Sequence, residues 1–300
     1  LGDPADSEMD RRRARELTTR PPGRGLTRDG KEMLLALPDT TAVRRPPDTR
    51  RARPVEVLPS LVRHHRIARC GEVVLGLGER ELAPITMDFD RHPHLLVLGD
   101  GECGKTATLR LLCTELIRTA EPSNASIELV DYRRTLLGVV ETAHLGGFSV
   151  SGPALSARMA ALSAQLDARM PDENVTQQQL RDRSWWDGPD IFVVVDDYDL
   201  VAGATGNPLT PLADYLPHAK DLGLHLIVAR RSGGAARAMF DPVLARLRDM
   251  GCSGLMMSAS PDEGVLLGAA RPTLQPPGRG TLLIRGRADE LIQLGWVPPP

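Results

Sequence analysis

One short segment constrains the fold of this chain more than any other. Residues 95–106 read Leu-Leu-Val-Leu-Gly-Asp-Gly-Glu-Cys-Gly-Lys-Thr, so an apolar run leads into the pattern Gly-x-x-x-x-Gly-Lys-Thr. The run predicts a buried strand over residues 94–98, and residues 107–119 carry apolar side chains at helical spacing. A strand, a glycine-rich loop and a helix in this order form an anion cradle, because loop N–H groups and the helix N-terminus both attract phosphate. The sequence therefore predicts a nucleotide-binding α/β domain.

The loop supplies most of the candidate contacts to ATP and Mg²⁺, the expected cofactors. Lys105 is expected to reach the β- and γ-phosphates, and Thr106 to ligate Mg²⁺ through its hydroxyl. The candidate nucleotide-binding residues of the loop are Gly101, Glu102, Cys103, Gly104, Lys105, Thr106 and Ala107. Cys103 has two interpretations, a redox switch or a small residue tolerated in the turn, and we favour the second.

A second apolar run, residues 191–195, ends in the carboxylates Asp196 and Asp197. Asp196 is expected to hold Mg²⁺ through water, and Asp197 is the candidate catalytic residue that orients the attacking water. Hydrolytic sites of this kind usually carry Glu at the second position. Asp is shorter by one methylene, roughly 1–1.5 Å, and misplacement by about 1 Å can cost on the order of 100-fold in rate. We therefore expect ATP binding with low turnover, and enzymatic activity stays an open question.

A third apolar run, residues 222–229, leads into Arg230 and Arg231. It predicts a buried strand whose end brings two arginines near the phosphates. Arg230 is the second candidate catalytic residue, as a sensor of the γ-phosphate or a group acting across a subunit boundary. A solvated basic strand end is an equally good interpretation of the same residues.

The order of the remaining elements predicts the fold class. Further strands are expected at residues 126–131, 254–257 and 281–285, and an amphipathic helix at residues 153–170. Strands separated by crossover-length segments indicate a RecA-like P-loop fold, a mostly parallel sheet with helices on both faces.

A repeated pentapeptide suggests the domain organisation. Pro-Pro-Gly-Arg-Gly at residues 21–25 recurs at residues 276–280, about 255 residues later, which favours tandem domains of that length. Residues 1–37 are then the C-terminal remnant of a preceding ATPase domain, which fits a chain that begins without Met. Residues 38–59, rich in Pro and Arg, read as a linker. Residues 60–300 form one whole ATPase domain.

Charge and composition exclude several functions. The formal net charge is −2, from 37 basic and 39 acidic residues, so nothing favours DNA or an anionic membrane as a partner. No apolar stretch approaches the 18 residues that would predict a membrane span, so no direct membrane contact is expected. Four cysteines without zinc or disulfide spacing fit free thiols in a reducing compartment.

These motifs, in this order, resemble the FtsK/SpoIIIE-type ATPase domains of the EccC family, the motors of actinobacterial type VII (ESX) secretion. The resemblance rests on residues 99–106, 192–200 and 225–237 and on the repeated pentapeptide. It implies the last of three tandem ATPase domains, with the end of the middle one attached. It departs from the translocase pattern at Asp197 and at Ala229-Arg230-Arg231, where Ala-Thr-Gln is usual, and both departures suit slow hydrolysis.

The resemblance also implies partners and a location. The expected partners are the C-terminal signal helix of WXG-type substrates, the neighbouring ATPase domains and other protomers of a hexameric motor. The expected location is the cytoplasm, within a membrane-associated secretion complex. Candidate residues for docking the helix are apolar and lie in the segment 254–268, where methionines suit an adaptable surface; they are Met256, Met257, Leu266 and Leu267.

Two other functions stay open at this point. A DNA-translocating ATPase domain shares the fold, although it would need clustered basic residues and steep salt dependence. A scaffold domain with a structural nucleotide is the third possibility, because the fold alone does not define function.

Overall fold

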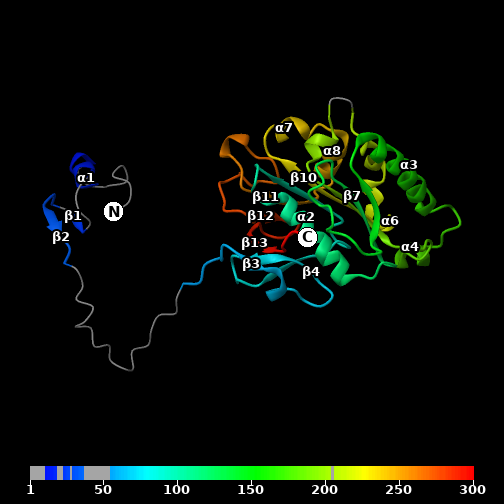
Figure 1. The fold of residues 1–300 in the computed structure, drawn as a ribbon, viewed down its shortest axis with the longest axis horizontal. Helices are drawn as coiled ribbons and strands as arrows, with labels where there is room; N and C mark the ends of the chain where they lie inside the picture. The colour runs from blue at the N-terminus through cyan, green and yellow to red at the C-terminus, as the bar shows by residue number, and fades with distance from the viewer. Residues whose placement is uncertain (1–10, 19–22, 28, 37–54, 204–205) are drawn as a thin grey trace, which may run out of the picture. The chain divides into compact units, whose positions relative to one another are not determined.

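The structure, a computed structural model, describes residues 11–18, 23–27, 29–36, 55–203 and 206–300 (Figure 1). The chain divides into two compact units, Leu1–Val55 and Glu56–Pro300. The described part of the first unit holds helix α1 (Arg11–Thr18) and the antiparallel strands β1 (Arg24–Leu26) and β2 (Glu32–Leu34). Most of the expected linker, residues 38–54, lies outside the described residues, and residues 55–59 form no helix or strand.

The second unit is built on one large sheet. The helices that matter for the site are α2 (Lys105–Thr119), α3 (Gly152–Arg169), α6 (Ala219–Leu222) and α8 (Pro242–Asp249). Shorter helical segments are η2 (His64–Arg66), α4 (Gln177–Asp182), α5 (Tyr198–Val201), η3 (Thr210–Asp214), η4 (Leu216–His218), α7 (Ala235–Ala238) and η5 (Pro261–Glu263). The strands are β3 (Val62–Arg63), β4 (Val73–Gly78), β5 (Pro84–Met87), β6 (His94–Gly99), β7 (Ala125–Val130), β8 (Leu145–Ser149), β9 (Asp190–Val195), β10 (Leu224–Arg231), β11 (Ser253–Met257), β12 (Arg279–Leu283) and β13 (Glu290–Trp296).

The sheet is parallel where the nucleotide motifs lie and antiparallel at one side. Its strand order is β5-β4-β13-β12-β11-β6-β10-β9-β7-β8, with β3 paired to β13. The six consecutive strands β11, β6, β10, β9, β7 and β8 run parallel to one another. On the other side of β11, strands β12, β13, β4 and β5 continue the sheet in antiparallel pairs. The strands that carry the predicted motifs, β6, β10 and β9, are adjacent. Their carboxyl ends therefore meet at one edge, where open α/β sheets bind ligands.

Both faces of the sheet are covered, as the buried strands require. Strand β6 sends Leu96 and Leu98 to one core cluster and Leu95 and Val97 to the other, which is the two-residue period of a strand. Helix α2 packs on the second cluster, and α3, α6 and α8 pack on the first (Figure 1). The RecA-like expectation of a mostly parallel sheet with helices on both faces is confirmed.

The predicted elements match observed ones, with shifts at their ends. The expected strands correspond to β6, β7, β9, β10, β11 and β12, and the two expected helices to α2 and α3. Strands β4, β5, β8 and β13 were not predicted from the sequence. Strand β8 reads Leu-Gly-Gly-Phe-Ser, and its glycines hide the strand pattern.

The expectation for a helix-docking surface is wrong for the described conformation. Met256 and Met257 lie in the middle of the sheet on β11, with 3% and 0% of their surface exposed. Leu266 and Leu267 are 6% and 7% exposed and belong to the core that α3 and α8 cover. All four are core residues: Met256 and Met257 lie in a strand between β6 and β12, and Leu266 and Leu267 pack into the first core cluster. None of them offers a surface to a partner.

A buried carboxylate fixes the far end of α2. Glu115 is fully buried and accepts hydrogen bonds from Arg118 at 2.6 Å and from the Val74 N–H of β4 at 2.6 Å, and it contacts His64. Burial raises the pKa of this carboxyl, but the hydrogen bonds from Arg118, Val74 and His64 outweigh burial and lower the pKa below its usual 4.5. An ionised side chain thus adds to the apolar packing that positions the phosphate-loop helix.

We predict that Glu115→Ala destabilises the second unit by about 3 kcal/mol, because it removes the only carboxylate that pairs with Arg118 among the described residues and leaves the buried Val74 N–H without its acceptor. The lowered pKa means that the Glu115 contribution is complete above pH 4.5 and is lost as the pH falls below that value. Urea unfolding at pH 7 and at pH 4 measures both effects. The matched control is Glu121→Ala, an exposed acid just beyond the helix, and equal losses in the two variants would contradict the assignment.

Candidate functional site

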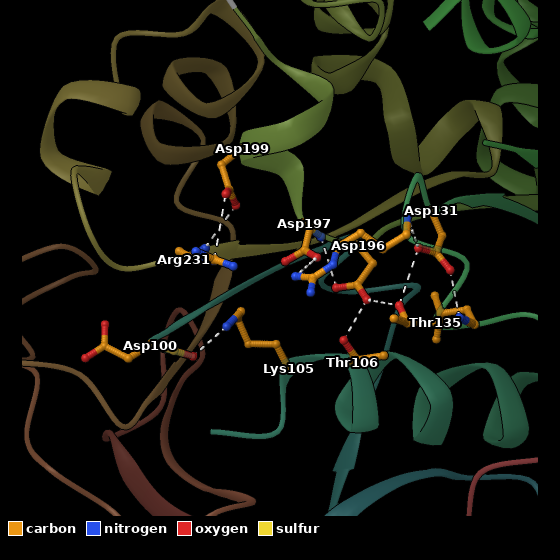
Figure 2. A network of polar contacts seen from close by, with 11 residues as sticks. Asp100, Lys105, Thr106, Asp131, Thr135, Asp196, Asp197, Asp199 and Arg231 are labelled. Carbon is orange, nitrogen blue, oxygen red and sulfur yellow. Dashed lines mark hydrogen bonds and ion pairs between the residues drawn. The ribbon is translucent and has the colours of Figure 1, made fainter. Parts of the chain in front are cut away.

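The motif residues converge on a cavity at the carboxyl edge of the parallel strands (Figure 2). The cavity has a volume of about 450 Å³. Its walls come from the phosphate loop, from the loop after β7 and from the ends of β9 and β10; they are Gly101, Glu102, Gly104, Lys105, Thr106, Ala107, Arg133, Thr135, Asp197 and Arg231. Six of the seven predicted loop residues line it.

The phosphate loop has the backbone that a cradle needs. Gly104 precedes α2 with φ +108°, and a Cβ there would lie 3.2 Å from the N atom of Gly278. Only glycine accepts both conditions without strain. Lys105 is buried, and its Nζ donates to the Asp100 carbonyl at 2.6 Å, so the ammonium lies over the loop at the start of α2 (Figure 2).

Cys103 has a packing role in the described structure. Its side chain is 4% exposed, lies 3.9 Å from the Met257 sulfur and does not line the cavity. Burial raises the pKa of the thiol, which keeps it protonated and unreactive. The small-residue interpretation fits this position, and the redox switch has no support.

Asp196 joins the two halves of the site. Its Oδ2 accepts hydrogen bonds from the Thr106 hydroxyl at 2.6 Å and from the Thr135 hydroxyl at 3.0 Å (Figure 2). The side chain is almost fully buried, and burial raises its pKa, with a further rise from the adjacent Asp197 carboxylate. A buried carboxylate with a like charge beside it is stabilised by a cation.

The site fits Mg²⁺ bound together with a nucleotide. Among the described residues no cluster of three or more His, Cys, Asp or Glu side chains could hold a metal alone. Mg²⁺ commonly takes one or two protein ligands and completes its octahedron with phosphate oxygens and water. Thr106 would be the direct ligand and Asp196 would hold the ion through water, and their oxygens are 2.6 Å apart. The ion would neutralise charge on the β- and γ-phosphates.

Asp197 lines the cavity but is already engaged. Its Oδ2 accepts from the Arg133 guanidinium at 3.2 Å, and its backbone is left-handed, with φ 46°. Asp and Asn adopt this region far more readily than Glu does. The carboxylate that would orient water is therefore short, held by the backbone and paired with a cation.

The expectation for Arg230 needs correction. Its side chain is 8% exposed, and one guanidinium nitrogen donates to the carbonyl of Arg231 at 2.5 Å and to that of Gly233 at 3.5 Å. Arg231, one residue further along, lines the cavity and lies 4.0 Å from Asp199 (Figure 2). Successive side chains of a strand point to opposite faces, so only one of the two arginines can face the phosphates.

We predict that Arg231→Ala and Arg230→Ala have different effects. Arg231→Ala should weaken ATP binding roughly 10-fold more than ADP binding, because it removes a cation from the γ-phosphate side of the cavity. Arg230→Ala should leave the ratio of ATP to ADP affinity unchanged and lower the unfolding temperature, because its hydrogen bonds hold the turn after β10. Calorimetric titration and thermal unfolding measure these quantities, and the opposite pattern would restore Arg230 to the site.

The loop after β7 is the part of the site that the sequence analysis missed. Asp131 Oδ1 accepts from the Arg133 N–H at 3.1 Å and Oδ2 from the Leu136 N–H at 2.7 Å, so this carboxylate shapes the turn that presents Arg133 and Thr135. Figure 2 shows Asp131 and Thr135 beside Asp196. A signal was present, because Asp131 ends an apolar strand just as Asp196 does.

The fold and the site define a P-loop nucleoside triphosphatase domain. A family model described as FtsK/SpoIIIE matches residues 65–232, more than half of the chain. The chain belongs to the FtsK/SpoIIIE family.

Individual relatives are secretion proteins. The chain is 55% identical to the ESX-4 secretion system protein EccC4 of Mycobacterium tuberculosis over 308 aligned residues, which cover 100% of this chain and 25% of EccC4. It is 41% identical to the ESX secretion system protein EccC of Thermomonospora curvata, covering 99% of this chain and 24% of that protein. A solved structure of Thermomonospora curvata EccC, comprising ATPases 2 and 3 in complex with a signal sequence peptide, matches 99% of this chain and 57% of its own, at a TM-score of 0.80 and 39% identity. The chain thus spans about a quarter of the length of EccC4 and of the Thermomonospora curvata EccC.

Proposed function

We propose that this chain is an ATP-binding, slowly hydrolysing motor domain of a type VII secretion ATPase, and that it recognises C-terminal signals of WXG-type substrates. The observation that carries the nucleotide part is the contact of Thr106 with Asp196 at 2.6 Å, which joins the phosphate loop to the acidic strand end. P-loop nucleoside triphosphatases hold Mg²⁺ with this pair of groups, a hydroxyl of the loop and the aspartate that ends a neighbouring strand.

Slow hydrolysis is supported by the geometry around Asp197. The attacking water has to be positioned in line with the γ-phosphate, and a carboxylate serves this role when it is free to contact the water. Asp197 is one methylene shorter than Glu, and its charge is shared with Arg133. Binding depends on other groups, the loop N–H groups, Lys105 and Thr106, and is expected to be unaffected.

The two units support the assignment of residues 1–37 to the end of a preceding ATPase domain. Arg24 and Arg279 follow Pro-Pro-Gly in the two copies of the repeat, and each is the first residue of a strand, β1 or β12. Both strands pair antiparallel with the next strand along the chain, β2 and β13. Equivalent hairpins that begin within equivalent pentapeptides are what tandem domains would give. The larger unit, Glu56–Pro300, is then the last ATPase domain.

The substrate part rests on the relatives. The Thermomonospora protein of known structure carries a signal sequence peptide, and this chain matches 99% of its own length to that structure. We extend that partner to this chain as a C-terminal helix of a WXG-type substrate, and we expect neighbouring ATPase domains and other protomers to be partners too. A cytoplasmic position in a membrane-associated complex follows from the same proposal. In the part of the chain that the structure describes, no helix combines the length and hydrophobicity of a membrane span.

Fluorescence anisotropy tests the substrate. A labelled C-terminal peptide of a WXG-type substrate is titrated with the chain at about 150 mM salt, beside the same peptide in scrambled order and a labelled DNA duplex. We expect saturable binding of the native peptide only. Tight DNA binding with a steep salt dependence would favour a DNA-translocating domain instead, an alternative that the net charge of −2 disfavours. Equal binding of the native and scrambled peptides would contradict sequence recognition.

A further inference from the structure

Asp100, the second residue of the phosphate loop, contacts three separate segments, although it does not line the cavity of about 450 Å³ at the loop (the phosphate cavity). Its carbonyl accepts from Lys105 Nζ at 2.6 Å, and its N–H donates to the Ser258 carbonyl at 2.8 Å. Its carboxylate accepts a hydrogen bond from the Ser232 hydroxyl. Figure 2 shows this carboxylate on the side of the loop away from Lys105. The side chain of Asp100 therefore binds the neighbouring strand end and not the phosphate cavity.

Ser232 joins the end of β10 to the phosphate loop. It is fully buried, and its N–H donates to the Gly99 carbonyl at 3.1 Å while its hydroxyl donates to Asp100. These two hydrogen bonds continue the pairing of β10 with β6, whose last paired residues are Arg231 and Gly99. Two glycines follow at residues 233–234 and offer no side chain. Ser232 is therefore the last side chain that fixes this strand end to the loop before the chain turns.

Arg231 depends on this attachment for its place on the wall of the phosphate cavity. Its side chain is 55% exposed, and Asp199 lies 3.5 Å from its backbone N and 4.0 Å from its Nε. Exposed ion pairs of this length contribute little. The Arg230 guanidinium contacts carbonyls of the turn after β10, but these bonds stay within the turn and do not reach the phosphate loop. The position of Arg231 relative to the loop is therefore set mainly through the next residue, Ser232.

We propose that Asp100 and Ser232 are positioning residues for the discrimination of ATP from ADP, because their hydrogen bond couples the phosphate loop to the strand end that carries Arg231. The proposal rests on the nucleotide binding proposed above and names the residues that set its selectivity. Asp100 holds Lys105 through its carbonyl and the Arg231 strand end through Ser232, so one residue places both cations. Displacement of a binding group by about 1 Å is costly. ADP lacks the γ-phosphate, so a displaced Arg231 weakens the binding of ATP and leaves that of ADP unchanged.

The ratio of ATP affinity to ADP affinity tests the proposal, because a loss of stability alone does not change this ratio. Mg²⁺ complexes of ATP and of ADP are titrated by calorimetry into the 300-residue chain and its variants. We expect Ser232→Ala and Asp100→Ala each to lower the preference for ATP about 5-fold, the effect of losing one hydrogen bond. Asp100→Asn keeps an oxygen that accepts from Ser232, so it should retain most of the preference. Thermal unfolding verifies that each variant is folded.

The matched control is Ser258→Ala, which removes a hydroxyl from another residue that contacts Asp100. The Ser258 hydroxyl accepts from the Gln275 N–H at 3.0 Å, and the carbonyl that holds the Asp100 N–H is kept in the variant. We expect Ser258→Ala to lower the unfolding temperature and to leave the preference for ATP at the wild-type value.

The double variant Ser232→Ala with Arg231→Ala separates positioning from an independent contribution. If Ser232 acts through Arg231, the double variant has the same preference for ATP as Arg231→Ala alone. A further loss in the double variant, a Ser232→Ala preference equal to that of the Ser258 control, or equal wild-type affinities for ATP and ADP would overturn the positioning role and leave nucleotide binding intact. Failure of the wild-type chain to bind Mg·ATP would overturn the proposed function itself.

Discussion

Lys105→Ala is expected to abolish measurable binding of Mg·ATP by the chain. Lys105 is 7% exposed and is the only lysine on the wall of the phosphate cavity, where its Nζ lies against the loop carbonyl of Asp100. Removing one partner of a buried charge pair costs about 2–5 kcal/mol, which corresponds to a loss of roughly 30-fold to several thousand-fold in affinity. Isothermal calorimetry at pH 7 with excess Mg²⁺ measures the loss directly.

The control for this substitution is Lys220→Ala. Lys220 is exposed on α6 and does not line the cavity, so its substitution removes the same charge from the chain without changing the site. We expect wild-type affinity in this variant and unchanged unfolding temperatures in both. An Mg·ATP affinity in Lys105→Ala within about 3-fold of the control would sink the assignment of the phosphate loop.

The phosphate loop and the buried strands could be predicted from the sequence, because there the local pattern and the tertiary structure agree. The loop at residues 99–106 needs glycine backbone freedom, a lysine and a hydroxyl at fixed spacing, and Gly104, Lys105 and Thr106 all line the cavity. The continuous apolar run at residues 191–195 predicts a strand that is buried on both faces. In the structure its side chains alternate between the two core clusters: Ile191, Val193 and Val195 lie in one, and Phe192 and Val194 in the other.

The sequence was insufficient where a side chain's role depends on one step of register. Arg230 and Arg231 are chemically identical, and only the direction of β10 at its end decides which one faces the cavity. Met256 and Met257 suggested an adaptable surface, but a strand at the centre of a wide sheet has both faces covered, so both side chains are core. Strands β13 and β4 were not predicted, and their antiparallel pairing connects segments about 200 residues apart.

Some site residues become neighbours only through the pairing of strands that are far apart in the sequence. Arg133 and Thr135 meet Asp197 and Asp196 because β7 and β9 are neighbours in the sheet, although about 60 residues separate them along the chain. Arg133 and Thr135 belong to no motif, so spacing carried no information about them.

Asp197→Glu is expected to raise ATP turnover by about 10- to 100-fold while changing Mg·ATP affinity less than about 3-fold. The added methylene extends the carboxylate by roughly 1–1.5 Å, toward the place where the attacking water would lie beside a bound γ-phosphate. Misplacement of a catalytic group on this scale changes the rate by about two orders of magnitude. Affinity is retained because Lys105, Thr106 and Asp196 are unchanged. The left-handed backbone at residue 197 disfavours Glu, so a small decrease in unfolding temperature should accompany the gain.

The decisive comparison is with Asp197→Ala, because both substitutions alter the ion pair between Arg133 and Asp197 at 3.2 Å. If carboxylate reach limits the reaction, only the Glu variant accelerates, and the Ala variant is no faster than the wild type. If release of Arg133 toward the γ-phosphate is what matters, both variants accelerate together, and the ion pair itself is the restraint on turnover. Loss of ATP binding in the Glu variant would remove Asp197 from the water-orienting role, because a residue in that role does not hold the nucleotide. Single-turnover hydrolysis at saturating Mg·ATP separates these results, since it reports the chemical step without product release.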